Sequence, residues 1–408
     1  MKHFISRRNF LKAAGVTAAA SAMAAAVPQA SAGFLTGKDA AVTILYTNDV
    51  HTYIDNKSPK LTYAAIAAMK QGYVDEGKPV LLVDAGDHIQ GTAYGSMDDG
   101  ATIIELMNEA GYDIATPGNH EFDYGMARAK AIIKEADFPY VSCNWVDLRT
   151  GLRVLPAVKL FPAGGKWIAF VGITTPESFT KSTPAYFMNA KQTKYIYDIL
   201  GGDDGRKLYD AVQKAIDKAK TLGADIIIGL GHLGVDPSSS PWTSREVIEH
   251  TSGFDAFIDG HSHSDLEAVK AATNGTGKVG DTLLTSTGTK LASIGCIIMD
   301  KDSISVKSLP TAELTTSPDK VVAARAAAIQ KQIDDDYGTV FARTAYELNG
   351  AKAPNGNRDG ETNLGDLITD ALIWGARQNG EAVDAAVTNG GGIRATIKAG
   401  DITKKDVN

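Results

Sequence analysis

Short apolar runs that end in polar loops alternate with helical patterns from residue 41 onward. Seven of these runs are typical of buried strands: VTILYTND (42–49), PVLLVDAGD (79–87), YDIATPGNH (112–120), FPYVSCNW (138–145), WIAFVGIT (167–174), ADIIIGLGH (224–232) and FDAFIDGHSH (254–263). Amphipathic stretches lie between several of them, as in 102–111, where Ile103, Leu106 and Met107 share a face and Gly111 follows as a helix cap. The alternation predicts an α/β fold with helices covering a sheet and polar residues gathered where strands end.

The helical patterns thin out after Asp281, and three consecutive strands are expected at 281–287, 292–300 and 303–309. The stretch 317–338 is typical of one long helix, with Val321, Arg325 and Ala328 on one face and Gly338 at its end. Because this helix separates two regions of different composition, we interpret it as a linker.

A second region begins near Thr339. The stretch TNLGDLITDALIWGA (362–376) predicts a helix with Asn363 as its N-cap, and DAAVTN (384–389) predicts a strand that runs into the turn GGGIR. The apolar residues expected on one face of the helix are Leu364, Leu367, Ile368, Ala371 and Leu372. The region is shorter than a usual domain of roughly 100–150 residues, so we expect it to be incomplete.

The N-terminus is typical of a targeting segment. Paired arginines in SRRNFLK (6–12) precede a weakly apolar run over 13–27, and Ala30-Ser31-Ala32 fits a cleavage site. The pattern resembles the twin-arginine export signal, with a plain secretory signal or a retained anchor as alternatives. We therefore expect a signal peptide over 1–32, export by the twin-arginine translocase and a periplasmic protein. The apolar run is short of the roughly 20 residues of a membrane span, so no stable membrane anchor is expected.

Composition narrows the possible partners. The formal net charge of −7 offers no basic patch for nucleic acid, and a phosphate site would need local positive charge from metal ions or arginines. The two cysteines, Cys143 and Cys296, lie in strand-like runs, which favours two separate buried thiols, although a disulfide stays open in an oxidising compartment. The sequence does not indicate an oligomeric state.

Histidines and oxygen donors gather at the ends of the predicted strands. Five of the eight histidines lie in these loops, and a sixth, His88, adjoins Asp87. The clusters are Asp49-Val50-His51, Asp87-His88, Asn119-His120 with Asp123, His232, and His261-Ser262-His263. Each cluster alone is a weak signal. Together, carboxylate, amide and imidazole donors suit two divalent ions such as Zn²⁺, Mn²⁺, Co²⁺ or Fe²⁺, with one carboxylate bridging them.

Five motifs in this order, ILYTNDVH, DAGDHIQG, PGNHEFDYG, GLGHLGVD and DGHSH, resemble the calcineurin-like binuclear metallophosphoesterases. Within that family they are most similar to bacterial periplasmic 5′-nucleotidases, also called UDP-sugar hydrolases. The resemblance implies a four-layer α/β sandwich of two sheets flanked by helices over 33–316, the linker helix over 317–338, and an incomplete α/β substrate-binding domain over 339–408.

The resemblance also implies a role for each polar residue. The expected ligands of the first ion are Asp49, His51, Asp87 and His263, and those of the second ion are Asp87, Asn119, His232 and His261. His120 would stabilise the transferred phosphoryl group, and Asp123 would orient its ring. Neither Glu121 nor His88 is expected to act in catalysis. The motifs RDGETNLGDLITDA and NGGGIRA resemble the substrate-binding domain, which implies substrate contacts from Arg358, Asn363, Asn389 and Arg394.

The implied function is a 5′-nucleotidase that releases phosphate from nucleoside 5′-monophosphates by in-line attack of a metal-bridging hydroxide, with UDP-sugar hydrolysis as a further activity. Alternatives on the same scaffold are a 2′,3′-cyclic-nucleotide phosphodiesterase and a thiosulfohydrolase. Relatives clamp the base between two aromatic rings further along the second domain, and this chain ends before such positions. The base specificity is therefore left open. A non-catalytic nucleotide- or metal-binding protein is a further alternative function.

Overall fold

The computed structural model describes residues 40–54, 61–301, 303–310, 317–352, 354–393 and 395–407. The predicted signal peptide and Arg394 lie outside these residues. Within the described part of the chain, no helix combines the length and apolar character needed to cross a membrane.

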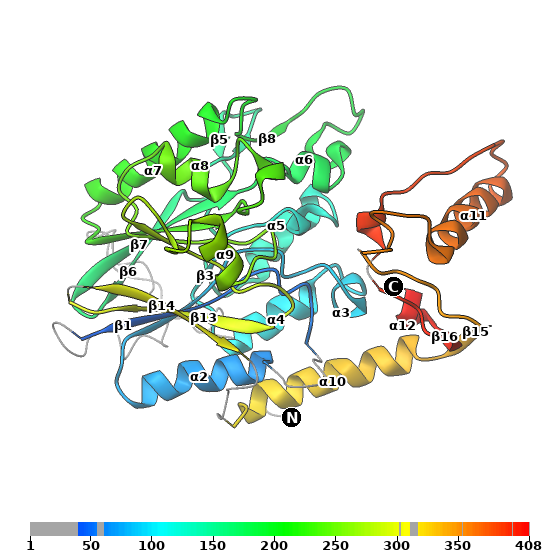
Figure 1. Ribbon diagram of the computed structural model, residues 1–408, viewed down its shortest axis with the longest axis horizontal. Coiled ribbons are helices and arrows are strands. Elements are labelled where there is room, and N and C mark those ends of the chain that lie inside the picture. Colours follow the sequence, from blue (N-terminus) through cyan, green and yellow to red (C-terminus); the bar gives the residue numbers. More distant parts are fainter. Residues whose placement is uncertain are drawn as a thin grey trace, which may run out of the picture.

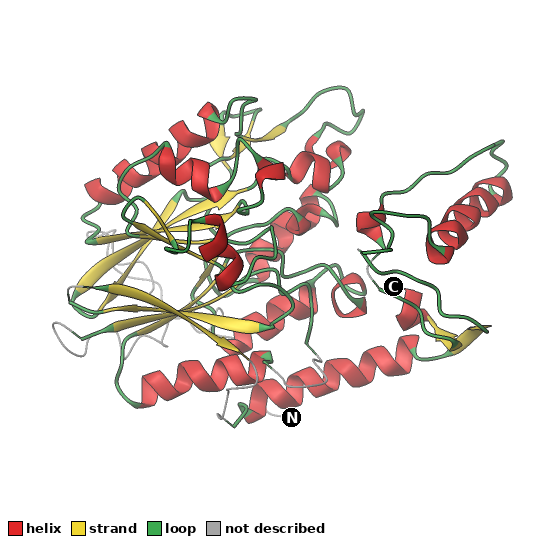
Figure 2. Cartoon of the chain, in the orientation of Figure 1, coloured by secondary structure: helices red, strands yellow, loops and turns green. Residues whose placement is uncertain are grey.

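Two stacked sheets form the centre of the molecule (Figures 1 and 2). The first has the order β14-β13-β1-β2-β3, and β1 pairs parallel with β2 and antiparallel with β13. The second has the order β11-β12-β10-β9-β7-β6, in which β7, β9, β10 and β12 run parallel. The strands of the first sheet are β1 (Val42–Thr47), β2 (Val80–Asp84), β3 (Ile114–Ala115), β13 (Ser293–Met299) and β14 (Ile304–Pro310). Those of the second are β6 (Val158–Ala163), β7 (Lys166–Thr174), β9 (Ile226–His232), β10 (Ala256–Ile258), β11 (Lys278–Val279) and β12 (Thr282–Thr285).

The facing sides of the sheets share one hydrophobic cluster, to which Ile44 and Val83 contribute from the first sheet and Phe170 and Ile228 from the second. Helices cover both outer faces. Those over the first sheet are α2 (Tyr63–Asp75), α4 (Ala101–Ala110), α5 (Met126–Glu135) and α10 (Lys320–Tyr337), and those over the second are α7 (Arg206–Thr221), α8 (Ser244–Glu249) and α9 (Leu266–Ala272). Helix, sheet, sheet and helix make four layers, which confirms the predicted fold class. Strands covered on both faces are mostly apolar, which explains the nearly continuous apolar runs in the sequence.

Short elements connect these layers. A three-stranded sheet contains β4 (Trp145–Asp147), β5 (Leu152–Arg153) and β8 (Tyr197–Ile199), and the short helices are α3 (Ala93–Ser96), η2 (His120–Phe122), α6 (Ser178–Lys181), η3 (Pro184–Phe187) and η4 (Pro237–Ser239). The prediction of a strand over 138–145 was wrong for most of that stretch. Before β4 begins, its only strand-like pairing among the described residues is an isolated bridge between Tyr140 and Ala115. Its apolar residues are buried by packing rather than by strand pairing.

Helix α10 occupies most of the predicted stretch 317–338 and packs on the helical layer of the first sheet (Figure 1). Asp319 caps its N-terminus by accepting hydrogen bonds from the backbone N–H groups of Val321 and Val322. The predicted face was wrong: Val321 is 66% exposed, whereas Val322, Ile329 and Ile333 are buried. Two adjacent valines and many alanines support either face, and only the packing partners α2 and α4 decide between them.

The C-terminal region contains β15 (Val340–Thr344), α11 (Asn363–Gln378), η6 (Gly390–Gly392), β16 (Gly400–Thr403) and α12 (Lys404–Val407). Two expectations were wrong here. The N-cap of α11 is Thr362 rather than Asn363, because the Thr362 hydroxyl accepts from the N–H of Gly365. The stretch 384–389 is irregular rather than a strand. Of the apolar face of α11, Leu364 is buried, while Leu367 and Leu372 are about half exposed.

Both cysteines are buried free thiols. Cys296 lies on β13 and Cys143 packs in the cluster beneath the helices of the second sheet. Burial raises the pKa of the Cys143 thiol to about 12, which makes it chemically inert at neutral pH.

Candidate metal centre

The seven predicted ligands meet at the carboxyl ends of the strands. Asp49 and His51 follow β1, Asp87 follows β2, Asn119 follows β3, His232 ends β9, and His261 and His263 follow β10. Five of them have left-handed backbone conformations, with φ of 49° at Asp49, 49° at His51, 59° at Asp87, 80° at His261 and 55° at His263. Such a conformation costs on the order of 1–3 kcal/mol at a residue with a side chain. The cluster of strained positions therefore indicates a site held in shape by its surroundings.

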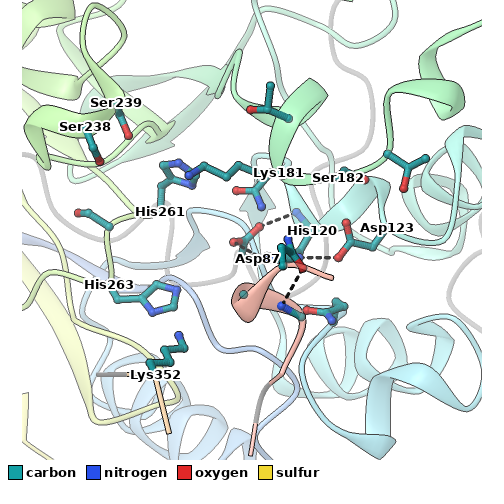
Figure 3. Close-up of a pocket in the computed structure, with 18 of the residues that line it drawn as sticks. Asp87, His120, Asp123, Lys181, Ser182, Ser238, Ser239, His261, His263 and Lys352 are labelled. Atoms are coloured by element: carbon teal, nitrogen blue, oxygen red, sulfur yellow. Dashed lines mark hydrogen bonds and ion pairs between the residues drawn. The ribbon is translucent and has the colours of Figure 1, made fainter. Parts of the chain in front are cut away.

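Asp87 lies at the middle of the cluster (Figure 3). Its Oδ2 is 3.1 Å from His232 Nε2 and 4.0 Å from His51 Nε2, while its Oδ1 accepts a hydrogen bond of 2.8 Å from the backbone N–H of His120. Three groups of residues each bring their ligand atoms within 4.8 Å of one another: Asp49, His51 and His263; His51, Asp87 and His120; Asp87, His232 and His261. The first and third groups contain parts of the two expected ligand sets, and Asp87 belongs to both the second and the third group.

The first group combines the carboxylate of Asp49 with two imidazoles, those of His51 and His263, which are both neutral. His51 Nδ1 lies 2.9 Å from the carbonyl oxygen of Gln90, which can only accept, so Nδ1 carries the proton and Nε2 offers its lone pair. His51 Nε2 is 3.0 Å from His263 Nε2, and His263 Nε2 is 3.4 Å from Asp49 Oδ1. Burial lowers the pKa of His51 well below its usual value and that of His263 to about 3. Both rings are therefore in the neutral form that binds metals.

Beside the third group, Asn119 lines the same hollow as Asp87 and His261, and its buried Oδ1 has no hydrogen-bond partner among the described residues. His232 Nδ1 donates to the carbonyl oxygen of Ala85 at 2.6 Å, which again points Nε2 at the centre of the site. Buried polar atoms normally have partners, so the unpaired Asn119 Oδ1 indicates a place for a ligand. Oxygen and imidazole donors beside carboxylates fit a divalent cation.

The electrostatics also favour positive charge here. Burial raises the pKa of Asp49 to about 7. Burial on its own would lower the pKa of His232, but the carboxylates of Asp87 and Asp49 outweigh it and raise that pKa to about 10. His232 and Asp49 thus hold protons strongly in the absence of metal, and bound cations could take the place of these protons. The residues of the site therefore fit divalent metal ions.

His120 faces the pocket from the start of η2, next to the cluster. Its Nδ1 is 2.5 Å from Asp123 Oδ2, and its Nε2 is 4.0 Å from Asp87 Oδ2 (Figure 3). This contact lets Asp123 hold the ring, and the orienting role that the resemblance implies for Asp123 stays a prediction. The same geometry also brings His120 into the second of the three groups, so distances alone do not separate a ligand from a group that contacts substrate.

Glu121 points away from the cluster and holds the backbone behind it. Its carboxylate accepts hydrogen bonds from the N–H groups of Asp87 at 2.9 Å, His88 at 2.9 Å and Gly118 at 2.6 Å. At Gly118 a Cβ atom would lie 2.3 Å from Asp87 Oδ1, so the close approach of the two loops requires glycine. His88 is buried against Asp84 and Tyr140, with ring nitrogens 2.8 Å and 2.7 Å from their oxygens.

Sequence reasoning missed Glu177 and Lys181. Glu177 Oε2 is 2.7 Å from His261 Nε2 and accepts from the Ser239 hydroxyl at 2.6 Å, and Lys181 Nζ lies 3.5 Å from Oε1. Burial would raise the pKa of Glu177, but the hydrogen bonds from His261 and Ser239 outweigh it and lower that pKa to about 2. The signal was present, because Glu177 follows the C-terminal end of β7, where the other polar clusters were sought, but no histidine marks it.

A hollow of about 770 Å³ opens beside the cluster, between the sandwich and the C-terminal region. Lys181 lines it from the sandwich, and Lys352, Arg358 and Asn389 line it from the other side. Asn363 is not among the described lining residues. Its side chain donates to the carbonyl oxygen of Glu347 at 2.9 Å and accepts from the N–H of Asn349 at 2.7 Å, which fixes the chain before α11.

Comparison with known families agrees with this architecture. Residues 42–265, more than half of the chain, match the family described as calcineurin-like phosphoesterase, and residues 340–408 match the 5′-nucleotidase C-terminal domain. The chain belongs to the calcineurin-like phosphoesterase family. Residues 5–24 match the signal sequence of the twin-arginine translocation pathway, which indicates export across a membrane.

The chain is similar to the 5′-nucleotidase of Rattus norvegicus, with 28% identity over 89% of this chain and 65% of the relative. It is 27% identical to the trifunctional nucleotide phosphoesterase protein YfkN of Bacillus subtilis, over 90% of this chain and 26% of that protein. Among solved structures, the 5′-nucleotidase precursor of Thermus thermophilus superposes with a TM-score of 0.69 at 25% identity, covering 90% of this chain and 73% of that one. The chain thus spans just under two thirds of the rat enzyme.

Proposed function

We propose that this protein is an exported, metal-dependent phosphohydrolase of the 5′-nucleotidase type, which releases phosphate from nucleoside 5′-monophosphates. The main support is that Asp87 lies among six other donor residues, beside a hollow that Arg358 and Asn389 line from the C-terminal region. The similarity to 5′-nucleotidases in both parts of the chain supports the same function. UDP-sugars are a second substrate class within the proposal.

Two divalent ions are proposed, with Asp49, His51 and His263 holding the first, Asn119, His232 and His261 holding the second, and Asp87 shared. When bound, such ions supply the Lewis acidity that activates water and polarises the phosphoryl group. The protein's part is to position these ligands. The backbone hydrogen bonds of His51 and His232 and the strained turns at Asp49 and Asp87 do so before any substrate arrives.

His120 is proposed to contact the phosphoryl group and to carry a proton on Nε2 toward the leaving oxygen. The 2.5 Å contact between its Nδ1 and Asp123 supports this role, because a carboxylate stabilises the cationic ring and fixes its orientation. Arg358 suits a phosphate or ribose oxygen through its planar array of donors, and Asn389 lies beside it in the lining. Arg394 is proposed for the same surface from its motif alone.

The division into a catalytic domain (33–316), a linker helix (317–338) and a substrate-binding domain (339–408) is part of the proposal. The proposal also includes cleavage near Ala32, passage through the twin-arginine translocase and a periplasmic location. The match of residues 5–24 to the twin-arginine signal supports the export route. The net charge of −7 gives no support for nucleic acid as a partner, and the positive charge for a phosphate ester would come from the metal ions and from Arg358.

One assay tests the proposal. The protein is loaded with Mn²⁺, Co²⁺ or Zn²⁺, and phosphate release is measured from AMP, from a 2′,3′-cyclic nucleotide and from an aryl phosphate. Preferred hydrolysis of AMP is the expected result. Cleavage of the cyclic nucleotide alone would assign the chain to the phosphodiesterase alternative, and no hydrolysis at full metal occupancy would refute the enzymatic proposal.

A further inference from the structure

The imidazoles of the metal centre are held in two different ways. His51 and His232 each donate from Nδ1 to a backbone carbonyl, of Gln90 at 2.9 Å and of Ala85 at 2.6 Å. His261 has a carboxylate partner instead, since its Nε2 lies 2.7 Å from Glu177 Oε2. It is held through the opposite ring nitrogen from the other two.

We propose that Glu177 is a positioning residue of the metal centre, which holds His261 so that Nδ1, rather than Nε2, binds the second ion. This inference rests on the proposed two-metal function. Its basis is that Nε2 is already engaged with Glu177, so the ring nitrogen left for the group of Asp87, His232 and His261 is Nδ1. The backbone of His261 is fixed as well, because its N–H donates to Asp49 Oδ2 at 3.0 Å.

Glu177 is itself held on three sides. Its Oε2 accepts from Ser239 on η4 at 2.6 Å, and its Oε1 pairs with Lys181, one turn further along α6, at 3.5 Å. The side chain is only 11% exposed, and it stands at the N-terminal boundary of α6, three residues after the end of β7. The Glu177 carboxylate cannot swing away from His261 without leaving the buried Ser239 hydroxyl and the His261 ring unpaired.

The contact has a chemical consequence beyond orientation. A carboxylate that accepts the N–H of a ligating imidazole makes that imidazole a stronger donor to the metal, and loss of such a partner lowers metal affinity about 10- to 100-fold. Only the second ion should be affected, because among the described ligands His261 alone contacts Glu177. A residue that only supported the fold would weaken both ions or neither.

The test uses Glu177→Gln in the full chain, with Glu246→Gln as the matched control. Glu246 is a carboxylate of α8 that bonds Ser240 and Thr243 and caps its own helix without contacting the metal centre. Cadmium titration followed by ¹¹³Cd NMR should give two resonances for the parent protein. In Glu177→Gln we expect one resonance to move and its ion to bind about 10- to 100-fold more weakly, with the other unchanged. Glu246→Gln should match the parent protein in both its ¹¹³Cd resonances and its two cadmium affinities.

A measurement on the parent protein itself keeps the inference testable if Glu177→Gln fails to fold. With ¹⁵N-histidine labelling, the ¹¹³Cd–¹⁵N coupling of His261 should appear at Nδ1. Coupling at Nε2, or unchanged cadmium affinities and shifts in Glu177→Gln, would overturn the role of Glu177. Binding of fewer than two ions by the parent protein would instead count against the proposed two-metal function.

Discussion

At the scale of residues, the stretch from Asn119 to Asp123 shows how one turn separates four polar side chains. It contains the 3₁₀ turn η2, in which residues three apart lie on the same side. His120 and Asp123 have this spacing, which brings Nδ1 and the carboxylate together at 2.5 Å. Glu121 is rotated away from them toward the backbone of Asp87 and His88. The local helix type therefore decides which carboxylate serves the histidine.

Replacing His120 by alanine separates its two possible roles. If His120 contacts substrate, His120→Ala should keep both metal ions and lose about 10²- to 10⁴-fold in turnover of an aryl phosphate, the usual contribution of a general acid. His232→Ala is the comparison, because a buried ligand should take an ion with it. Metal content by mass spectrometry and phosphate release check both variants. Loss of an ion from His120→Ala would make it a ligand, as the group of His51, Asp87 and His120 permits.

Replacing Glu121 tests its role behind the site. Glu121→Ala would leave the N–H groups of Asp87, His88 and Gly118 buried without their acceptor. Each unpaired buried donor costs about 1–3 kcal/mol, so we expect at least about 3 kcal/mol of lost unfolding free energy in the metal-free protein. Urea unfolding measures this. Glu109→Ala is a suitable control, since Glu109 lies on α4 away from the cluster, and an equal effect in both variants would contradict the role of Glu121.

At the scale of elements, helix α10 belongs energetically to the sandwich rather than acting only as a connection. Ile329 is 4% exposed and packs in the cluster with α2 and α4, whereas Val321 is 66% exposed on the opposite side. Ile329→Ala should lower the unfolding free energy by about 2–5 kcal/mol, and Val321→Ala by less than about 0.5 kcal/mol. Calorimetric melting of both variants checks the difference, and equal melting temperatures would show that α10 is not part of the core.

The sequence predicts the elements of the sandwich better than their details. Strands such as β1 and β9 are buried along their whole length and mostly apolar because both faces are covered, and their polar ends point to Asp49 and His232. Glu177 follows a predicted strand, but that position alone did not assign its role, because the role depends on His261, 84 positions away, being brought to 2.7 Å by the fold. The prediction of the buried face of α10 was wrong for a similar reason. The adjacent residues Val321 and Val322 allow two different apolar faces, and only the packing in the fold determines which of them is buried. The stretch 384–389 has strand-like residues, but the structure gives it no strand to pair with among the described residues.

At the scale of the whole molecule, the metal centre joins the two sheets. Asp49 and Asp87 extend from the first sheet, and His232 and His261 extend from the second, so ions bound among them would connect the layers at the edge of their shared core. Ligands that bind only the folded state stabilise it, by about 2.7 kcal/mol at a concentration one hundred times the dissociation constant.

Metal binding should therefore raise the melting temperature of the sandwich, at roughly 2–4 °C per kcal/mol, and a chelator should reverse the rise. Asp87→Asn should lose most of this stabilisation, because Asp87 belongs to two of the ligand groups. The amide can still accept the hydrogen bond that the His120 N–H gives to Oδ1, so the metal-free variant should stay folded. His250→Ala is the matched control, since His250 stacks on Tyr209 at 4.4 Å, outside the centre, and its variant should keep the full response. Scanning calorimetry with and without Mn²⁺ decides the point. An undiminished metal response in Asp87→Asn would mean that the stabilising ions bind elsewhere in the molecule.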